Sequence, residues 1–190
     1  EDDANTALFR IEIIQVPLAN PAAARIVSSP RLFNDLAAPA RHAEYPADSI
    51  ALEARRRAAG RPPRGGQRTG PTQCHDITVY PEVGRAGGAC GGYGLLLDIT
   101  DVRNPRRMYA AADSNFSFWH SATFNNDGTK VLFTDEWGGG SQPRCRLTDK
   151  YEWGANALFT VEGDELVFQS YYKMPAPQTA EETCVAHNGS

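Results

Sequence analysis

A strand signature that recurs three times constrains the fold of this chain more than any other feature. The apolar runs 9–12, 95–98 and 159–162 each end on a carboxylate, and a turn and a second β-rich run follow each of them. The turn chemistry repeats behind the first two runs as Asn20-Pro21 and Asn104-Pro105. Recurrence of this kind predicts a repeat architecture, in which one β-unit cannot bury its faces alone and stacks on its neighbours.

A second element, a β-prone run led by histidine, repeats in phase with the first. It begins at His75 and at His120, and residues 184–190 resemble the start of a third run. Each full unit is therefore predicted to hold four antiparallel strands, A to D. The expected strands are 75–82, 85–90, 94–100 and 106–112 in the first unit and 120–125, 130–137, 157–162 and 165–173 in the second. Repeated four-stranded units are the blades of a β-propeller.

We therefore predict an all-β fold, a partial β-propeller built of four-stranded antiparallel blades with one short inserted helix. The expected domains are a half blade of strands C and D (1–33), an inserted helix with a basic Pro/Gly-rich loop (34–73), a first full blade (74–117), a second full blade with a long B–C loop (118–183) and the start of a further blade (184–190). A closed propeller needs at least ~4 blades, so we interpret the sequence as part of a longer chain or of an assembly.

One run carries a family resemblance. Residues 94–101, followed by Asn104-Pro105, resemble the signature of LVIVD-repeat proteins, which are mostly exported bacterial β-propellers. The resemblance extends over 74–190 and, as half a blade, over 7–33, whereas 34–72 departs from it as an insertion. It implies a propeller fold and an extracytoplasmic location, periplasmic or at the cell surface. It brings no catalytic motif.

The four cysteines allow three pairings. Cys74 opens strand A and Cys90 closes strand B, so an antiparallel hairpin places them side by side. Cys145 and Cys184 fall on connections that emerge on the same face of a propeller. We favour the disulfides Cys74–Cys90 and Cys145–Cys184, which imply an oxidising compartment. Four unpaired thiols are the alternative, and a zinc site built from the cysteines is disfavoured because no C-x-x-C spacing occurs.

The insertion is predicted to hold a helix near 48–59, with Asp48 or Ser49 as N-cap and Gly60 as C-terminal cap. A protein partner or an anionic membrane surface is a possible target of the basic loop, and a solvated loop is the simpler interpretation. The candidate partner-binding residues are Arg55, Arg56, Arg57, Arg61, Arg64, Arg68, Trp137 and Trp153. The net charge of −4 and the lack of aromatic residues among these arginines exclude nucleic acid. No apolar run approaches the ~20 residues of a transmembrane segment.

Three histidines are the candidate metal ligands. His75, His120 and His187 occupy equivalent points of strand A, the innermost strand of a blade, and can converge on copper, zinc or iron. The preferred interpretation is that each histidine hydrogen-bonds the backbone of the next blade. Asp135 and Glu136 offer carboxylates at a rim, but adjacent strand residues point to opposite faces. No nucleophile elbow, P-loop or dinucleotide fingerprint is present, and no catalytic residue is assigned.

The sequence thus favours a non-catalytic extracytoplasmic binding or scaffold module without a cofactor. Its expected partner is another protein, or the remainder of a longer propeller chain. The alternative is a metal-dependent enzyme of oxidase type, with copper, zinc or iron held by the three blade-borne histidines.

Overall fold

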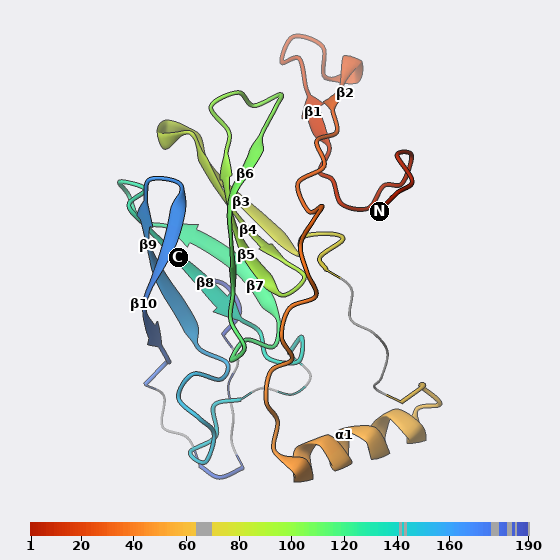
Figure 1. Cartoon of the computed structure of the whole chain (residues 1–190), viewed down its shortest axis with the longest axis vertical. Coiled ribbons are helices and arrows are strands. Elements are labelled where there is room, and N and C mark those ends of the chain that lie inside the picture. Colours follow the sequence, from red (N-terminus) through yellow and green to blue (C-terminus); the bar gives the residue numbers. More distant parts are fainter. Residues whose placement is uncertain are drawn as a thin grey trace.

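The computed structural model describes residues 1–63, 70–140, 142, 144–175, 179–181, 184 and 186–189. Within these ranges the strands form three antiparallel sheets of two, four and four strands, and one α-helix is present. Figure 1 shows the two larger sheets packed together, with the two-stranded hairpin and the helix at opposite ends of the molecule. The prediction of an all-β chain with one short helix is therefore confirmed.

Both four-stranded sheets are meanders in which the strands follow chain order. The first contains β3 (Asp76–Tyr80), β4 (Arg85–Cys90), β5 (Tyr93–Asp98) and β6 (Arg106–Ala112), with a 3-10 turn at Pro81–Val83. The second contains β7 (Trp119–Phe124), β8 (Lys130–Asp135), β9 (Asn156–Glu162) and β10 (Glu165–Tyr172). Each strand ends two residues or fewer from its expected bound, because turn residues with positive φ, such as Gly128 (70°) and Gly163 (62°), mark the connections.

The two four-stranded sheets bury their facing sides against each other. Leu96 of β5 lies in one apolar cluster with Trp119 of β7 and Phe133 of β8. Gly94 of β5 permits this approach, because a Cβ at that position would lie 2.5 Å from the Cζ3 atom of Trp119. Strand β7 also lies against β3 and β4 of the preceding sheet, so one unit stacks directly on the next.

The N-terminal segment covers the other face of the first sheet. Phe9 and Phe33 pack with Leu95 and Leu97 in a second apolar cluster. Beyond this cluster, β1 (Ile13–Gln15) and β2 (Arg25–Ser28) form the projecting hairpin, with a 3-10 turn at Pro21–Ala23 between them.

The strand predicted at 9–12 is wrong in position. Phe9 has a φ of 67°, which a β-strand does not allow, and Arg10 forms only an isolated bridge to Arg31. The strand begins instead at Ile13, after the chain has placed the Phe9 side chain in the second apolar cluster.

Helix α1 (Pro46–Ala58) begins two residues before the predicted start. Its N-cap is Tyr45 rather than Asp48 or Ser49, because Pro46 occupies the first helical position, which its fixed φ favours. Gly60, with a φ of 66°, follows the C-terminal end as expected. No residue of α1 is buried.

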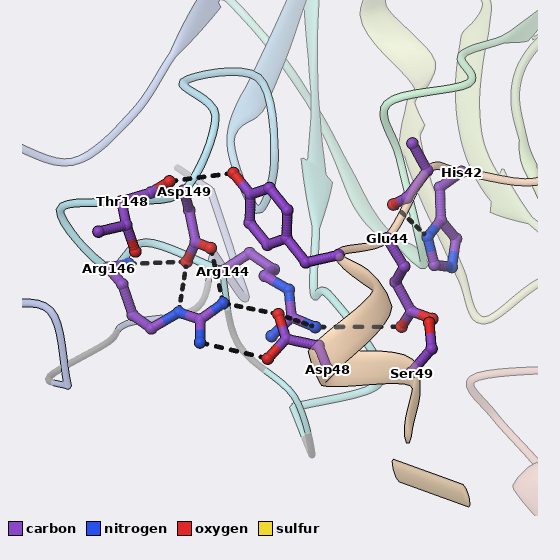
Figure 2. Close-up of polar contacts among 10 residues, drawn as sticks. His42, Glu44, Asp48, Ser49, Arg144, Arg146, Thr148 and Asp149 are labelled. Atoms are coloured by element: carbon purple, nitrogen blue, oxygen red, sulfur yellow. Dashed lines mark hydrogen bonds and ion pairs between the residues drawn. The ribbon is translucent and has the colours of Figure 1, made fainter. Parts of the chain in front are cut away.

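The start of α1 is fixed to the long loop between β8 and β9, as Figure 2 shows. The Arg146 guanidinium lies 2.8 Å from the Asp48 carboxylate and 2.8 Å from that of Asp149. The buried Arg144 lies 3.4 Å from Asp48. These ion pairs hold the insertion over Trp137 and Trp153, which stack with ring centroids 4.8 Å apart.

Two disulfides join the predicted pairs, Cys74–Cys90 and Cys145–Cys184. The first ties the start of the first unit to the end of β4. The second ties the β8–β9 loop to the segment that contains His187. No helix in the described ranges is long and apolar enough to cross a membrane.

Candidate metal centre

The end of β8 and the start of β7 form the base of the candidate site. Trp119 pairs with Asp135 in the antiparallel register, and the Glu136 amide donates to the carbonyl of Phe118 at 3.0 Å. This pairing places Glu136, immediately after β8, beside His120 of β7. A third element, residues 186–189, then adds His187.

His120, Glu136 and His187 converge. Each offers one ligand atom, and these atoms all lie within 4.8 Å of one another. The Nε2 atom of His120 is 3.9 Å from Oε2 of Glu136, and the Nε2 atom of His187 is 4.0 Å from Oε1 of the same carboxylate. One glutamate therefore faces two imidazoles, which is a donor set that transition metals accept.

His75 joins this cluster as a stacked ring. Its centroid lies 4.3 Å from that of His120, and the His120 ring lies 4.1 Å from that of His187. Its Nδ1 atom lies 3.2 Å from the carbonyl oxygen of His120, so the tautomer protonated at Nδ1 donates a hydrogen bond there. The structure thus brings all three predicted histidines together, while the group of converging ligand atoms contains Glu136 in place of His75.

The environment of His120 favours the neutral imidazole that metals require. Its side chain is 8% exposed, and burial lowers its pKa, as do the neighbouring His187 and His75. The Nδ1 atom of His120 is buried and has no hydrogen-bond partner among the described residues. Since no hydrogen bond to Nδ1 fixes the tautomer, the ring can carry its proton on Nδ1 and present the lone pair of Nε2 to Glu136.

The site opens to solvent on one side. The side chain of His187 is 56% exposed and that of Glu136 is 16% exposed, whereas His120 lies at the base. The Asn188 side-chain nitrogen lies 3.1 Å from Nδ1 of His187. Because the oxygen and nitrogen of an Asn amide can exchange places by a flip, Asn188 can either donate to Nδ1 of His187 or accept from it.

Asp135, next to Glu136, anchors the end of β8 by hydrogen bonds to the backbone. Its carboxylate is fully buried and accepts backbone hydrogen bonds from Ser117 (3.0 Å), Phe118 (2.9 Å) and Gly154 (3.1 Å). Burial raises its pKa to about 7, while these three amide donors oppose the rise. Asp135 and Glu136 therefore do point to opposite sides, one into the protein and one towards the histidines.

The candidate partner-binding residues lie elsewhere. Arg55, Arg57 and Arg61 are exposed at and beyond the C-terminal end of α1, and the Arg56 guanidinium donates to the carbonyl of Pro62. Arg64 and Arg68 lie outside the described residues. Trp137 and Trp153 are 0% and 1% exposed, so neither ring presents a surface to a partner in this arrangement.

Sequence inspection found the histidines but did not select Glu136. The position of Glu136 could have been inferred from the strand register. Strands A and B of one unit are antiparallel, so a residue at the end of strand B lies near the start of strand A, where His120 is. What the sequence lacked was the face to which each of the two adjacent carboxylates points.

No protein-family model, curated protein or solved structure matches this chain.

Proposed function

We propose that this chain binds a divalent transition metal through His120, Glu136 and His187. The observation that supports the proposal is the convergence of two imidazoles and one carboxylate within 4.8 Å, where burial favours the neutral form of His120. The geometry therefore favours the alternative drawn from the sequence over a module without a cofactor.

The donor set narrows the choice of metal. Two imidazoles and a carboxylate suit zinc, iron(II) and copper(II), whereas copper(I) prefers thiolate and thioether ligands. All four cysteines are held in disulfides and supply no thiolate. Three protein ligands with a solvent-exposed side leave coordination positions for water or substrate, as in catalytic zinc and non-haem iron sites. This is the feature that supports a metal-dependent enzyme, including one of oxidase type.

We place this site in an exported protein of propeller type. Two observations support the stacking of successive blades. His75 donates to the carbonyl of His120, and the Ser121 and Thr134 hydroxyls donate to the carbonyl of His187 at 3.2 and 2.6 Å. The carbonyls of His120 and His187 are thus each bonded by side chains of the preceding unit. The two disulfides support an oxidising, extracytoplasmic location, and the LVIVD-like runs agree with it.

Metal titration of the purified chain tests the function. We expect about one zinc or cobalt ion per chain by elemental analysis and calorimetry, and at least tenfold weaker binding in His120→Ala and Glu136→Gln. Glu162→Gln is the matched control, since Glu162 is an exposed carboxylate at the end of β9. Equal affinity in Glu136→Gln and Glu162→Gln contradicts the assignment.

A specific observation also favours a binding or scaffold role. The β1–β2 hairpin exposes Ile14 (58%), Leu18 (96%) and Ile26 (57%), and a lone two-stranded hairpin is marginally stable in water. We propose that this hairpin pairs with a second copy of the chain, which would cover these side chains. In sedimentation experiments, self-association that Leu18→Ser abolishes supports this role, and a monomer at all concentrations contradicts it.

A further inference from the structure

The segment that contributes His187 is held at two places. Cys184, three positions before His187 in the sequence, is joined to Cys145 of the β8–β9 loop. On the other side, Ser121 and Thr134 donate to the His187 carbonyl, and the Thr123 hydroxyl donates to that of Gly189 at 2.6 Å. The three hydroxyl groups hold the backbone of residues 187–189 against β7 and β8. The disulfide holds the preceding part of the segment to the β8–β9 loop.

We propose that the Cys145–Cys184 disulfide controls the metal affinity of the site, so that reduction by a dithiol releases the metal. The proposal rests on the function proposed above. In the reduction the dithiol supplies two electrons and two protons. The S–S bond between Cys145 and Cys184 breaks to give two thiols, and the reductant closes to its own disulfide.

The position of His187 explains why the affinity of the site for the metal depends on the disulfide. Its side chain is 56% exposed, and its ring packs on one face against His120, so few buried contacts hold it in place. With the disulfide open, the hydrogen bonds to the His187 and Gly189 carbonyls and the one from the Leu147 amide to the Thr179 carbonyl remain, but no covalent crosslink holds the ligand near the site. A ligand held by reversible bonds is displaced part of the time, and its effective concentration then falls towards the millimolar range of a tethered group.

The two disulfides differ in their relation to the ligands. Cys74 precedes His75, which stacks on His120 but lies outside the converging group of ligand atoms. Each disulfide joins a buried cysteine, Cys90 or Cys145, to a partly exposed one, Cys74 or Cys184, so the two are alike in their exposure to a reductant. Cys74–Cys90 is therefore the internal control, since its loss removes a crosslink without freeing a proposed ligand.

The test compares two double variants of the full chain. Cys145→Ser/Cys184→Ser removes the proposed control, and Cys74→Ser/Cys90→Ser removes the other disulfide. Zinc and cobalt ions alone are the probes, with affinity measured by calorimetry and by the visible absorption of cobalt. We expect the dissociation constant to rise on the order of 10- to 100-fold in the first variant, because His187 is then held without a crosslink, and less than threefold in the second. Serine variants avoid the metal binding of thiol reductants themselves.

Hydrogen exchange shows whether the effect acts through the segment. The amides around His187 should exchange faster in Cys145→Ser/Cys184→Ser, while those of β7 and β8 keep their protection. Unchanged affinity in that variant overturns the proposal while leaving the metal site intact. Equal losses of affinity in both double variants, or loss of protection in β7 and β8, also overturn it, since the disulfide then acts on general stability. A wild-type chain that binds neither ion overturns the proposed function itself.

Discussion

The substitution Asp48→Asn tests how the insertion is attached to the sheets. Asp48 accepts hydrogen bonds from the Arg146 guanidinium, the shorter at 2.8 Å, and lies 3.4 Å from Arg144. Both arginines keep another carboxylate when Asp48 is neutralised. Arg146 retains Asp149 at 2.8 Å, and Arg144 retains Glu44 at 4.0 Å. The substitution therefore removes one ionic partner and leaves no arginine without a carboxylate.

The expected loss follows from that geometry. Removing one partner of a buried ion pair costs about 3–5 kcal/mol when the other charge is left alone, and a hydrogen bond to a charged group contributes about 1.5–3 kcal/mol. Because both arginines remain paired, we expect about 1.5–2 kcal/mol. For a chain of this size each kcal/mol lowers the unfolding midpoint by about 2–4 °C, so the midpoint should fall by about 3–8 °C.

The loss should depend on pH. The hydrogen bond from Arg146 is the main cause that holds the pKa of Asp48 below its ordinary value of 3.8. A carboxyl group with a depressed pKa stabilises the folded state above its unfolded pKa, and this contribution disappears as the pH falls through the folded value. Wild type and Asp48→Asn should therefore differ fully at pH 7, and the difference should shrink as the pH falls below 3.8 and vanish below the folded pKa.

Thermal unfolding at pH 7 and pH 3 measures both effects, and hydrogen exchange of the α1 amides locates them. Glu82→Gln, at an exposed carboxylate, is the control for charge removal alone. Equal midpoints of wild type and Asp48→Asn at pH 7 refute the attachment. A difference at pH 3 as large as that at pH 7 refutes the ionic cause.

Three further predictions concern the sheets and the site. His75→Ala should retain metal within threefold of wild-type affinity, measured by calorimetry, because His75 lies outside the converging ligand atoms. Gly94→Ala should lower stability in urea by about 1–3 kcal/mol, since its Cβ would lie 2.5 Å from Trp119; an unchanged midpoint contradicts the close packing. Asp135→Asn should cost about 2 kcal/mol, because an amide group then faces the Gly154 N–H, and its thermal midpoint should not exceed that of wild type.

The strands were predictable because their signals are local. Alternating apolar residues and turns such as Asn125–Gly128 specify each hairpin without help from the rest of the chain. The strand expected at 9–12 failed because tertiary packing decides there, since Phe9 turns to a positive φ and packs beside Leu95. The N-cap at Tyr45 was missed because Pro46 starts the helix two residues earlier, and Asp48, which was expected to cap it, bonds instead to Arg146 at a sequence separation of 98.

In the candidate site, too, some features were predictable from local sequence and others depend on tertiary packing. The phase of the repeat was enough to bring His75, His120 and His187 together. The burial of Trp137 and Trp153 was not predictable, because it depends on the insertion folding over the long loop. Glu136 lies between these cases, since the register determines its place but not the direction of its side chain.

The repeat also explains why the converging ligands occur at only one of the two described junctions between units. His75 and His120 are 45 positions apart, and the same spacing relates Cys90 to Asp135 and Gly91 to Glu136. Each junction therefore stacks two imidazoles, at 4.3 Å in the first and 4.1 Å in the second. At the first junction the carboxylate position is a glycine with a φ of 50°, which has no side chain to offer a ligand.

The position before the glycine or glutamate, at the end of strand B, also differs between the two units. Cys90 and Asp135 are both fully buried at the end of strand B, where one anchors the chain through a disulfide and the other through backbone amides. The repeat thus supplies a buried anchor and a pair of stacked histidines at each junction. On the proposed function, the residue that follows the anchor determines which junction binds a metal, because two imidazoles alone lack the charge that Glu136 adds to the second junction.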